Sequence, residues 1–441
     1  MNSKIDTKII TFGCRLNIFE SEVIRKKIQI AGIKNAIVIH SCAITAEAER
    51  QAKQKLHQII KENPRSKIIL TGCSAQNSWE EYKDNPNIFA ILGNKEKLSQ
   101  TYYNELALLP KKKKPYIYVG KVLENPPEMI NISENDELFE FDGKTKAFVQ
   151  IQQGCNNRCT YCIVPYVRGK NQSFSEKSIL NQCKTFIKEG YKEIVITGVD
   201  ISEYGTDTKD KSLFTIVKKI LDTFPELERL RLSSLDPAKS YDQILGLMKT
   251  DKRLMPHFHL SIQSGDTRVL GTMRRRHNAD DIINLCKKIH NISKDIAIGA
   301  DVIVGFPSET DAEFENTYKL IKQCNITHLH VFPYSIRKGT PAATMPDQIP
   351  QDIKKARAKR LRNLGDKLKL KFIKSQKGKI TNILIENKNQ GYTENYIYTK
   401  ILGNPIPNNT IIKAEIIKVT KDGTAIARPT ENKQFWWQFW K

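Results

Sequence analysis

The chain has 441 residues, with 71 Lys and Arg against 48 Asp and Glu, which gives a formal net charge of +23. This length exceeds one ordinary core and predicts two or three domains, and the surplus positive charge favours a polyanionic partner such as nucleic acid or an acidic membrane surface. No apolar run approaches the roughly 20 residues that span a bilayer, and the amino terminus lacks the order of a signal peptide. We therefore expect a cytoplasmic protein that does not enter a membrane.

The first part of the chain repeats a short apolar run that closes in a cysteine. The runs are KIITFGC, AIVIHSC and KIILTGC, which end at Cys14, Cys42 and Cys73, and a helical pattern follows each of them. This repeat has the length of a strand and helix unit with a parallel neighbour. Because parallel strands end at the same edge of a sheet, the three cysteines should converge. The sequence predicts an N-terminal parallel α/β domain over residues 1–105.

Residues 106–140 are rich in proline and include the lysine run 111–114, which predicts a linker with a solvated tether. A second alternation of strands and helices then predicts a central partial (β/α)6 barrel over residues 141–372, with its site at the carboxyl ends of the strands. The six candidate strands are AFVQIQQG, EIVITGVD, RLRLSSLDP, HFHLSIQSG, AIGADVIVGFP and HLHVFPYS. A basic helix ends this part, and short strands between Gly, Asn and Asp turns predict a small β-barrel over residues 373–432. The role of the aromatic tail, residues 435–440, stays open.

The nine cysteines divide by their setting. Cys183, Cys286 and Cys324 fall in segments of helical period, and we expect buried structural thiols there. The other six form two groups of three, one of them the CxxxCxxC of QQGCNNRCTYC. A structural zinc site is closed by four ligands, whereas a 4Fe-4S cluster held by three thiolates keeps one iron open to a small molecule.

The chain resembles the radical S-adenosylmethionine methylthiotransferases along almost its whole length. The motifs that carry the resemblance are TFGCRLN, SCAITAEAERQAKQKL, TGCSAQ, CNNRCTYC, CIVPYVRG, RLSSLDP, SIQSGDTRVLGTMRRR, DVIVGFPSET and GYTENYI. The resemblance implies a TRAM-like C-terminal barrel and a 4Fe-4S cluster on Cys155, Cys159 and Cys162. That cluster would chelate S-adenosylmethionine and cleave it to a 5′-deoxyadenosyl radical. A second, auxiliary 4Fe-4S cluster on Cys14, Cys42 and Cys73 would carry the sulfur.

The resemblance also implies contacts for S-adenosylmethionine, each of which could instead be a packing residue or a turn former. Tyr161 matches an aromatic position of the signature, and Gly198 and Asp200 would meet the methionine amino group. The expected contacts to the ribose or carboxylate are Ser234, Gln263 and Arg274, and those to the adenine are the backbone at Val304 and Gly305. Residues 274–276 could equally face RNA. The implied reaction needs a low-potential electron donor and a sulfur donor.

A few residues indicate the substrate. Arg15 and Leu16, with GYTENYI, resemble the subgroup that acts on N6-threonylcarbamoyladenosine at position 37 in the anticodon stem-loop of tRNA. That base carries a carboxylate, for which the forked guanidinium of Arg15 is a candidate partner, although a solvated arginine is an equal alternative.

Two departures from the family pattern stand beside the motifs. His40 and Ser41 replace the usual Asn-Thr, and KNQSF follows Gly169 in place of an Arg-Glu-rich run. Three competing functions remain open: methylthiolation of isopentenyladenosine, methylthiolation of a ribosomal-protein aspartate, and a non-catalytic zinc-stabilised RNA-binding protein.

Overall fold

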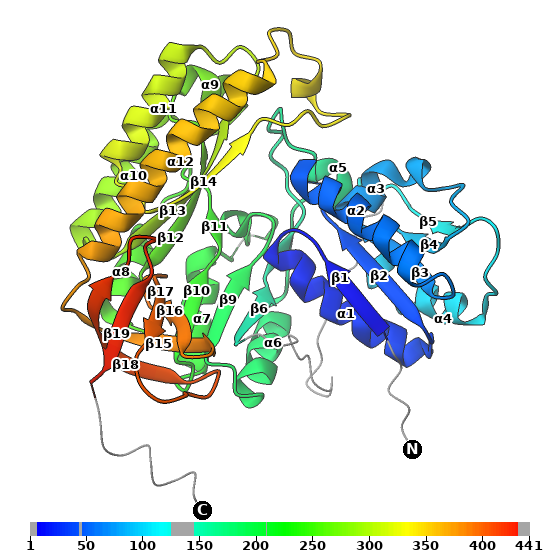
Figure 1. Cartoon of the computed structure of the whole chain (residues 1–441), viewed down its shortest axis with the longest axis horizontal. Coiled ribbons are helices and arrows are strands. Elements are labelled where there is room, and N and C mark those ends of the chain that lie inside the picture. The colour runs from blue at the N-terminus through cyan, green and yellow to red at the C-terminus, as the bar shows by residue number, and fades with distance from the viewer. Residues whose placement is uncertain (1–6, 44–45, 125–144, 209, 431–441) are drawn as a thin grey trace, which may run out of the picture.

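The computed structural model describes residues 7–43, 46–124, 145–208 and 210–430, and the aromatic tail lies outside this range. Three parts follow one another along the chain (Figure 1). An N-terminal sheet with helices leads to a larger central half barrel, and a small closed barrel packs against the base of the half barrel. Among the described residues, no helix is long and apolar enough to cross a bilayer.

The N-terminal part is a parallel sheet of order β1-β2-β3-β4-β5 with helices on both faces. One core, which includes Phe89 and Tyr103, lies between the sheet and helices α1 and α4. A second core, which includes Leu56 and Ile68, lies under α2. The elements are β1 (Thr7–Thr11), α1 (Arg15–Ala31), β2 (Ala36–Ser41), α2 (Ala46–Glu62), β3 (Lys67–Gly72), α3 (Cys73–Ser78), β4 (Ile88–Leu92), α4 (Gln100–Leu108) and β5 (Tyr116–Tyr118), with short 3-10 turns at Trp79–Glu81 and Glu96–Leu98.

The sheet extends beyond the three strands predicted from the sequence. Strand β5 pairs with β4 from Ala90↔Tyr116 to Leu92↔Tyr118, so the segment after residue 106 still belongs to this sheet. The lysine run is also attached to the fold. Lys111 Nζ donates to the carbonyl of Pro64 at 3.0 Å, and Lys114 Nζ forms an ion pair of 2.7 Å with Asp84. This part of the predicted linker is therefore ordered, and its remainder over residues 125–140 lies outside the described range.

The central part contains all six predicted strands, in two parallel sheets. One sheet has the order β10-β9-β6 and the other β11-β12-β13-β14, and a parallel bridge between Leu230 and Leu254 connects them. The strands are β6 (Lys146–Gln150), β7 (Gln152–Gln153), β8 (Gln172–Ser173), β9 (Glu193–Thr197), β10 (Arg229–Leu232), β11 (Ser234–Leu235), β12 (His257–Gln263), β13 (Ala297–Val304) and β14 (His328–Pro333). The helices are α5 (Val164–Arg168), α6 (Glu176–Lys188), α7 (Leu213–Thr223), α8 (Asp242–Thr250), α9 (Thr267–Thr272), α10 (Ala279–Ile292), α11 (Asp311–Gln323) and α12 (Gln351–Lys374), with 3-10 turns at Ile201–Glu203 and Pro341–Ala343.

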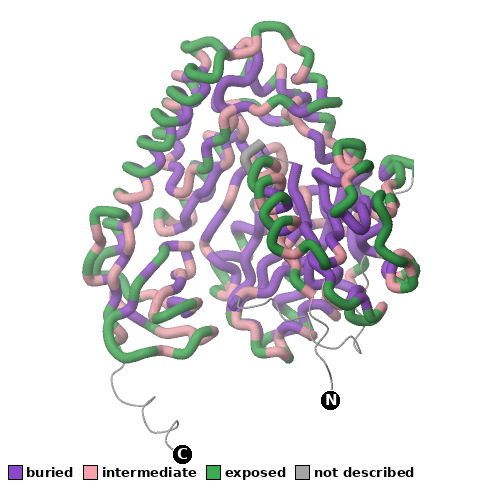
Figure 2. The backbone as a smooth tube through the Cα atoms, turned by 45° about the vertical axis from the view of Figure 1, so that its right-hand side comes forward, coloured by how far each residue is buried: buried purple, intermediate pink, exposed green. Residues whose placement is uncertain are grey.

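The long strands of the half barrel have two unlike faces, because successive side chains of a strand point to opposite sides. On β12 and β13, Phe258, Leu260 and Ile298 are fully buried in the core that the outer helices cover. The alternate residues of β12 are the polar His257, His259, Ser261 and Gln263, and on both strands the alternate residues are only partly buried toward the carboxyl ends. The buried and less buried parts of the chain are coloured in Figure 2. Cys183, Cys286 and Cys324 are buried, as the helical pattern predicts. The basic helix α12 is also present and packs on β14.

The C-terminal part is the predicted small barrel, closed in the order β15-β16-β17-β19-β18. Its strands are β15 (Ile380–Asn387), β16 (Gln390–Thr393), β17 (Tyr398–Ile401), β18 (Ile411–Val419) and β19 (Ala425–Pro429). The loop before β17 covers the amino-terminal ends of the central strands. Arg231 Nη1 donates to the carbonyl of Glu394 at 3.1 Å, and a ring nitrogen of His328 lies 3.2 Å from the carbonyl of Tyr396. The GYTENYI motif thus forms the floor of the half barrel.

Candidate active site

The cysteine loop of the central part lies at the carboxyl end of β6. Gly154 has a φ of +67°, and a Cβ atom at this position would come within 1.8 Å of the Lys170 carbonyl oxygen, so only glycine fits before Cys155. Backbone hydrogen bonds then fix the loop. The amide of Cys155 donates to Gly169 at 3.1 Å, and the amide of Cys162 donates to Cys159 at 3.0 Å. Local chain geometry therefore presents all three thiols of CxxxCxxC together.

The charges around this loop come from elements distant in sequence. Arg275 Nη1 lies 3.6 Å from the sulfur of Cys159, and its Nη2 donates to the carbonyl of Ser261 at 2.9 Å. Burial, and then the neighbouring cysteines and Asp200, raise the pKa of Cys155 to about 12; burial raises that of Cys162 to about 12 also. Thiols in this setting become thiolates only against a strong positive charge, such as that of bound iron.

The second cysteine set is assembled from three separate loops. Cys14 precedes helix α1, Cys42 follows strand β2, and Cys73 opens helix α3 directly after β3. Their convergence shows in the packing. A Cβ atom on Gly13 would come within 2.8 Å of the sulfur of Cys42. The charges of both Cys73 and Cys14 also act on the same guanidinium, that of Arg168. The convergence predicted from the strand repeat is present.

A buried ionic network lies beneath this second set and joins two parts of the molecule. Arg168 of the central part donates to Glu20 Oε1 at 2.8 Å and to Asn17 Oδ1 at 2.6 Å. Lys97 Nζ donates to the other oxygen of Glu20 at 2.7 Å and lies 3.0 Å from a ring nitrogen of His40. Burial opposes ionisation of Glu20, but the charges of Arg168 and Lys97 outweigh it and hold the pKa of Glu20 well below its usual range. His40 is fully buried in this network.

The two cysteine sets lie close to each other. The thiols of Cys73 and Cys162 interact electrostatically, although they come from different parts of the chain. Between the sets, Cys73 packs with Ala43, Ile163 and Val167 in one apolar cluster. Asn94 reaches both sides of the boundary, with its amide 3.7 Å from the sulfur of Cys73 and 2.7 Å from the carbonyl of Val167. The two cysteine sets therefore meet at the boundary between the N-terminal and central parts.

The spacing of the thiols distinguishes a single ion from a larger group. Zinc bonds to sulfur at about 2.3 Å, which holds thiolates roughly 4 Å apart. Within the described ranges, the residues whose ligand atoms all lie within 4.8 Å of one another are His259, Asp301 and His330, and neither cysteine set meets this spacing. The sulfur atoms are thus more widely spread than one zinc ion requires. Three thiolates can instead hold a larger group, a 4Fe-4S cluster with one iron left open.

Most of the residues expected to contact S-adenosylmethionine lie at the carboxyl ends of the central strands, and Asp200 contacts the cysteine loop. The backbone amide of Asp200 donates a hydrogen bond of 2.9 Å to Gln152 Oε1, and its carboxylate accepts one from Asn157, inside the cysteine loop. Burial and the nearby Asp236 and Glu203 raise the pKa of Asp200 to about 6. The other expected contacts follow the strand ends: Gly198 after β9, Ser234 on β11, Gln263 at the end of β12, and Val304 and Gly305 at the end of β13.

Two adjacent arginines point in different directions, which the sequence could not predict. Arg274 is exposed and has a positive φ of 55°, whereas its neighbour Arg275 turns inward to Cys159 and Asp236. The run TMRRRH gave no signal for which arginine faces the cysteines, because the choice depends on how the chain leaves helix α9. Tyr161 packs partly buried beside Phe306 and Tyr334. In the segment KNQSF, which departs from the family pattern, Asn171 Oδ1 accepts a hydrogen bond from Gln152 and supports the cysteine loop.

Arg15 also extends from the N-terminal part toward the half barrel. Its charge contributes to lowering the pKa of His257 on strand β12, after the larger effects of burial and of Arg231. The guanidinium of Arg15 has no hydrogen bond or ion pair within the part of the chain that the structure describes. A guanidinium without a partner therefore lies near the inner face of the half barrel.

Comparisons with known proteins agree with this geometry. The family model described as the radical SAM superfamily matches residues 149–321, and that described as uncharacterized protein family UPF0004 matches residues 6–93. A threonylcarbamoyladenosine tRNA methylthiotransferase MtaB from Rickettsia prowazekii (strain Madrid E) is 43% identical over 420 residues, covering 95% of this chain and 96% of the relative. The chain belongs to the MtaB-type radical S-adenosylmethionine methylthiotransferases. Members of this family are transferases that use S-adenosylmethionine and iron–sulfur chemistry.

Two other relatives and one solved structure are also similar to this chain. The protein of the same name from Aquifex aeolicus (strain VF5) is 33% identical over 88% of this chain and 95% of its own. A tRNA-2-methylthio-N(6)-dimethylallyladenosine synthase from Clostridium botulinum (strain Okra / Type B1) is 32% identical over 95% of this chain and 98% of its own. The radical S-adenosylmethionine methyltransferase TsrM from Kitasatospora setae shares the fold, with a TM-score of 0.53 at 10% identity over 74% of this chain and 70% of that chain.

Proposed function

We propose that this protein inserts a methylthio group at carbon 2 of N6-threonylcarbamoyladenosine at position 37 of tRNAs. Two 4Fe-4S clusters would take part, one on Cys155, Cys159 and Cys162 and one on Cys14, Cys42 and Cys73. The observation that supports the proposal is the meeting of the two cysteine sets, where Cys73 of one set packs in one cluster with Ile163 and Val167, which follow Cys162 of the other. A single base held between them can reach both.

When bound, the clusters and S-adenosylmethionine supply the radical that activates the base and the sulfur and methyl that it receives. The chain's own side chains hold and orient these groups. Asp200 and the backbone at Gly198 would bind the methionine amino group. Tyr161, Ser234, Gln263 and Arg274 would contact other parts of S-adenosylmethionine, and Val304 and Gly305 its adenine. Arg275, already directed at Cys159, would stabilise the negative charge of the cysteine-bound cluster.

The charge distribution supports an RNA substrate. Exposed lysines follow the outer side of helix α12, and Lys355, Lys359 and Lys367 are examples. Other basic residues of this helix face inward, because Arg357 bonds to Glu309 at 2.7 Å. Phosphate contacts by the outer residues predict RNA binding that weakens steeply with salt. An anticodon-loop base is already accessible, so its presentation requires less unstacking than extrusion from a duplex. We place this activity in the cytoplasm, with a low-potential electron donor and a sulfur donor as further partners.

Mass spectrometry of nucleosides from total tRNA tests the substrate. Cells that lack the gene should lose the 2-methylthio form of N6-threonylcarbamoyladenosine and accumulate the unmethylthiolated nucleoside. Re-expression of the wild-type chain should restore it, and re-expression of a Cys159→Ala chain should not. If the gene's loss removes the 2-methylthio form of isopentenyladenosine instead, the reaction class stands and the substrate assignment is wrong.

A further inference from the structure

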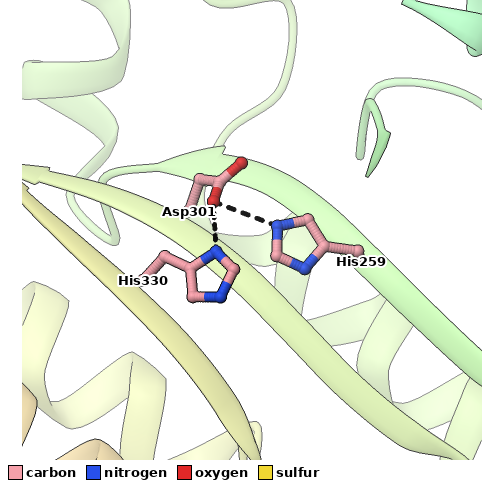
Figure 3. Close-up of side chains that lie close together, drawn as sticks. All are labelled: His259, Asp301 and His330. Atoms are coloured by element: carbon pink, nitrogen blue, oxygen red, sulfur yellow. Dashed lines mark hydrogen bonds and ion pairs between the residues drawn. The ribbon is translucent and has the colours of Figure 1, made fainter. Parts of the chain in front are cut away.

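A second cluster of titratable side chains lies on the inner face of the half barrel. His259 of β12, Asp301 of β13 and His330 of β14 form what we term the inner-wall triad (Figure 3). His259 Nε2 lies 3.0 Å from Asp301 Oδ1, and His330 Nδ1 lies 3.2 Å from the same oxygen. Adjacent paired strands carry all three residues, so the sheet itself holds the arrangement rather than a flexible loop.

The sheet is adapted to this arrangement. Residue 299 of β13 pairs with His259 of β12 and is a glycine, and a Cβ atom there would come within 2.5 Å of His259 Nδ1. The absence of a side chain lets the imidazole ring of His259 lie against β13 and reach Asp301. Burial opposes ionisation of Asp301, but the hydrogen bonds from His259 and His330 outweigh it and hold its pKa below the usual range.

The triad lies just below the cysteine loop of the central part. Arg275 connects the two levels, since it contacts both the sulfur of Cys159 and the carbonyl of Ser261. Ser261 is two residues beyond His259 on the same strand, a rise of roughly 7 Å. The inner-wall triad therefore lies about one side-chain layer deeper in the half barrel than the thiols, within the region that a base between the two cysteine sets would enter.

Positively charged side chains act on two histidines beside the triad. His257, whose ring centroid is 6.4 Å from that of His259, has its pKa lowered by burial and by the charges of Arg231 and Arg15. On β14, burial and the charge of Lys369 lower the pKa of His328 to about 3. Arg231 is paired with Glu193, so Arg15 and Lys369 are the charges that favour an anionic ligand at this wall.

The triad also has polar atoms left for a ligand. Its two imidazoles both bond to Oδ1 of Asp301, so Oδ2 and the second ring nitrogen of His330 are not used within the triad (Figure 3). The side chain of His330 is 60% exposed, whereas that of His259 is only 12% exposed. A ligand can therefore reach the triad through His330 and Asp301.

We propose that the inner-wall triad and Arg15 together bind the anionic hydroxy-acid side chain on N6 of the substrate adenine. The guanidinium of Arg15 binds the carboxylate. Asp301 and His330 accept hydrogen bonds from the hydroxyl and carbamoyl N–H groups. This assignment rests on the proposed function and deepens it, since it names the residues that separate this substrate from adenines with apolar N6 groups. A site built to hydrogen-bond a polar group strongly rejects an analogue that lacks it.

The test measures binding of two anticodon stem-loop RNAs to the full chain with its clusters loaded under anaerobic conditions. One RNA contains N6-threonylcarbamoyladenosine at position 37, and the other contains isopentenyladenosine there. The variants are Asp301→Asn, His330→Gln and Arg15→Gln, with His57→Gln on the exposed side of helix α2 as a matched control. Wild type and control should prefer the threonylcarbamoyl RNA. Each variant should lose about tenfold of that preference, because one ligand hydrogen bond is removed, while affinity for the isopentenyl RNA stays within about twofold.

The possible results distinguish a failure of the inner-wall triad's role from a failure of the proposed function, on which that role rests. A wild-type chain without preference for the threonylcarbamoyl RNA overturns the substrate assignment. A wild-type preference that all three variants retain overturns the role of the inner-wall triad alone. Binding that a chelator such as EDTA abolishes and added Zn²⁺ restores, in wild type but not in His330→Gln, would instead show a metal site. Because His330 is exposed, its variant should keep the wild-type melting temperature and iron content, so misfolding cannot produce the result.

Discussion

The two cysteine sets differ in how the fold builds them. Cys155, Cys159 and Cys162 lie within eight consecutive residues, and local backbone hydrogen bonds hold their loop. Cys14, Cys42 and Cys73 come from three loops that meet only because β1, β2 and β3 are parallel neighbours. The first set is encoded by spacing, whereas the second is encoded by the topology of a sheet. Damage to the N-terminal sheet should therefore affect the second set and leave the first intact.

Removal of one thiol from each set gives the largest expected contrast. Cys159→Ala should abolish cleavage of S-adenosylmethionine and all methylthio product, because it removes a ligand from the set that would bind that molecule. Cys42→Ala should retain some cleavage and lose the methylthio product. Iron content, 5′-deoxyadenosine release and nucleoside products are measured on the same anaerobic preparations, with Cys183→Ala as a control in a buried helix. Methylthio product from either triad variant would contradict the two-cluster scheme.

The glycines before the cysteines allow a milder test of the same contrast. Gly13 has a φ of +103°, and a Cβ atom there would come within 2.4 Å of the Cys42 Cβ; Gly154 has a φ of +67° and faces the Lys170 carbonyl oxygen. An alanine in a left-handed conformation costs roughly 1–2 kcal/mol before any clash. Gly13→Ala should lower iron in the N-terminal set by at least about half, and Gly154→Ala should do so in the central set.

Gly246 is the matched control, since a Cβ atom added there meets nothing within 4 Å. Gly246→Ala should keep wild-type iron content and cleavage of S-adenosylmethionine. The cysteine variants above give chains that carry only one intact set. Mössbauer or EPR spectra of those chains assign each loss of iron to its set. If Gly13→Ala loses equal amounts of iron from both sets, the two sets do not form independently.

The difference between the sets also explains what the sequence could and could not predict. CxxxCxxC is a pattern of spacing, and the repeat of apolar runs ending in cysteine was strong enough to predict the convergence of the other set. Strand β5 was missed because a run of three residues, Tyr116–Tyr118, between prolines and lysines has no detectable period. The inner-wall triad was missed for another reason. Its members lie 42 and 29 residues apart in the chain, and only the register of β12, β13 and β14 brings them together.

The ionic junctions at the two ends of the central part provide a prediction about stability. Glu20 pairs with Arg168 beside the N-terminal cysteines, and Glu193 pairs with Arg231 at 2.7 Å where the C-terminal barrel docks. Removing one partner of a buried pair costs about 3–5 kcal/mol. Glu20→Gln and Glu193→Gln should lower the free energy of unfolding by that amount in denaturant titrations at pH 7. Only Glu20→Gln should also release iron, and only from the N-terminal set.

The dependence on pH gives the sign of the Glu193 contribution. Burial opposes its ionisation, but the charges of Arg231 and Lys146 outweigh it and lower its pKa to about 2 from an ordinary value of 4.5. A lowered carboxyl pKa stabilises the fold fully above the ordinary value and less as the pH falls toward the lowered one. The stability gap between wild type and Glu193→Gln should therefore be equal at pH 7 and pH 6 and should narrow below about pH 4.5. A gap that widens on acidification would mean that Glu193 is protonated in the native chain, and the docking of the C-terminal barrel would then rest on the arginine hydrogen bonds to backbone carbonyls alone.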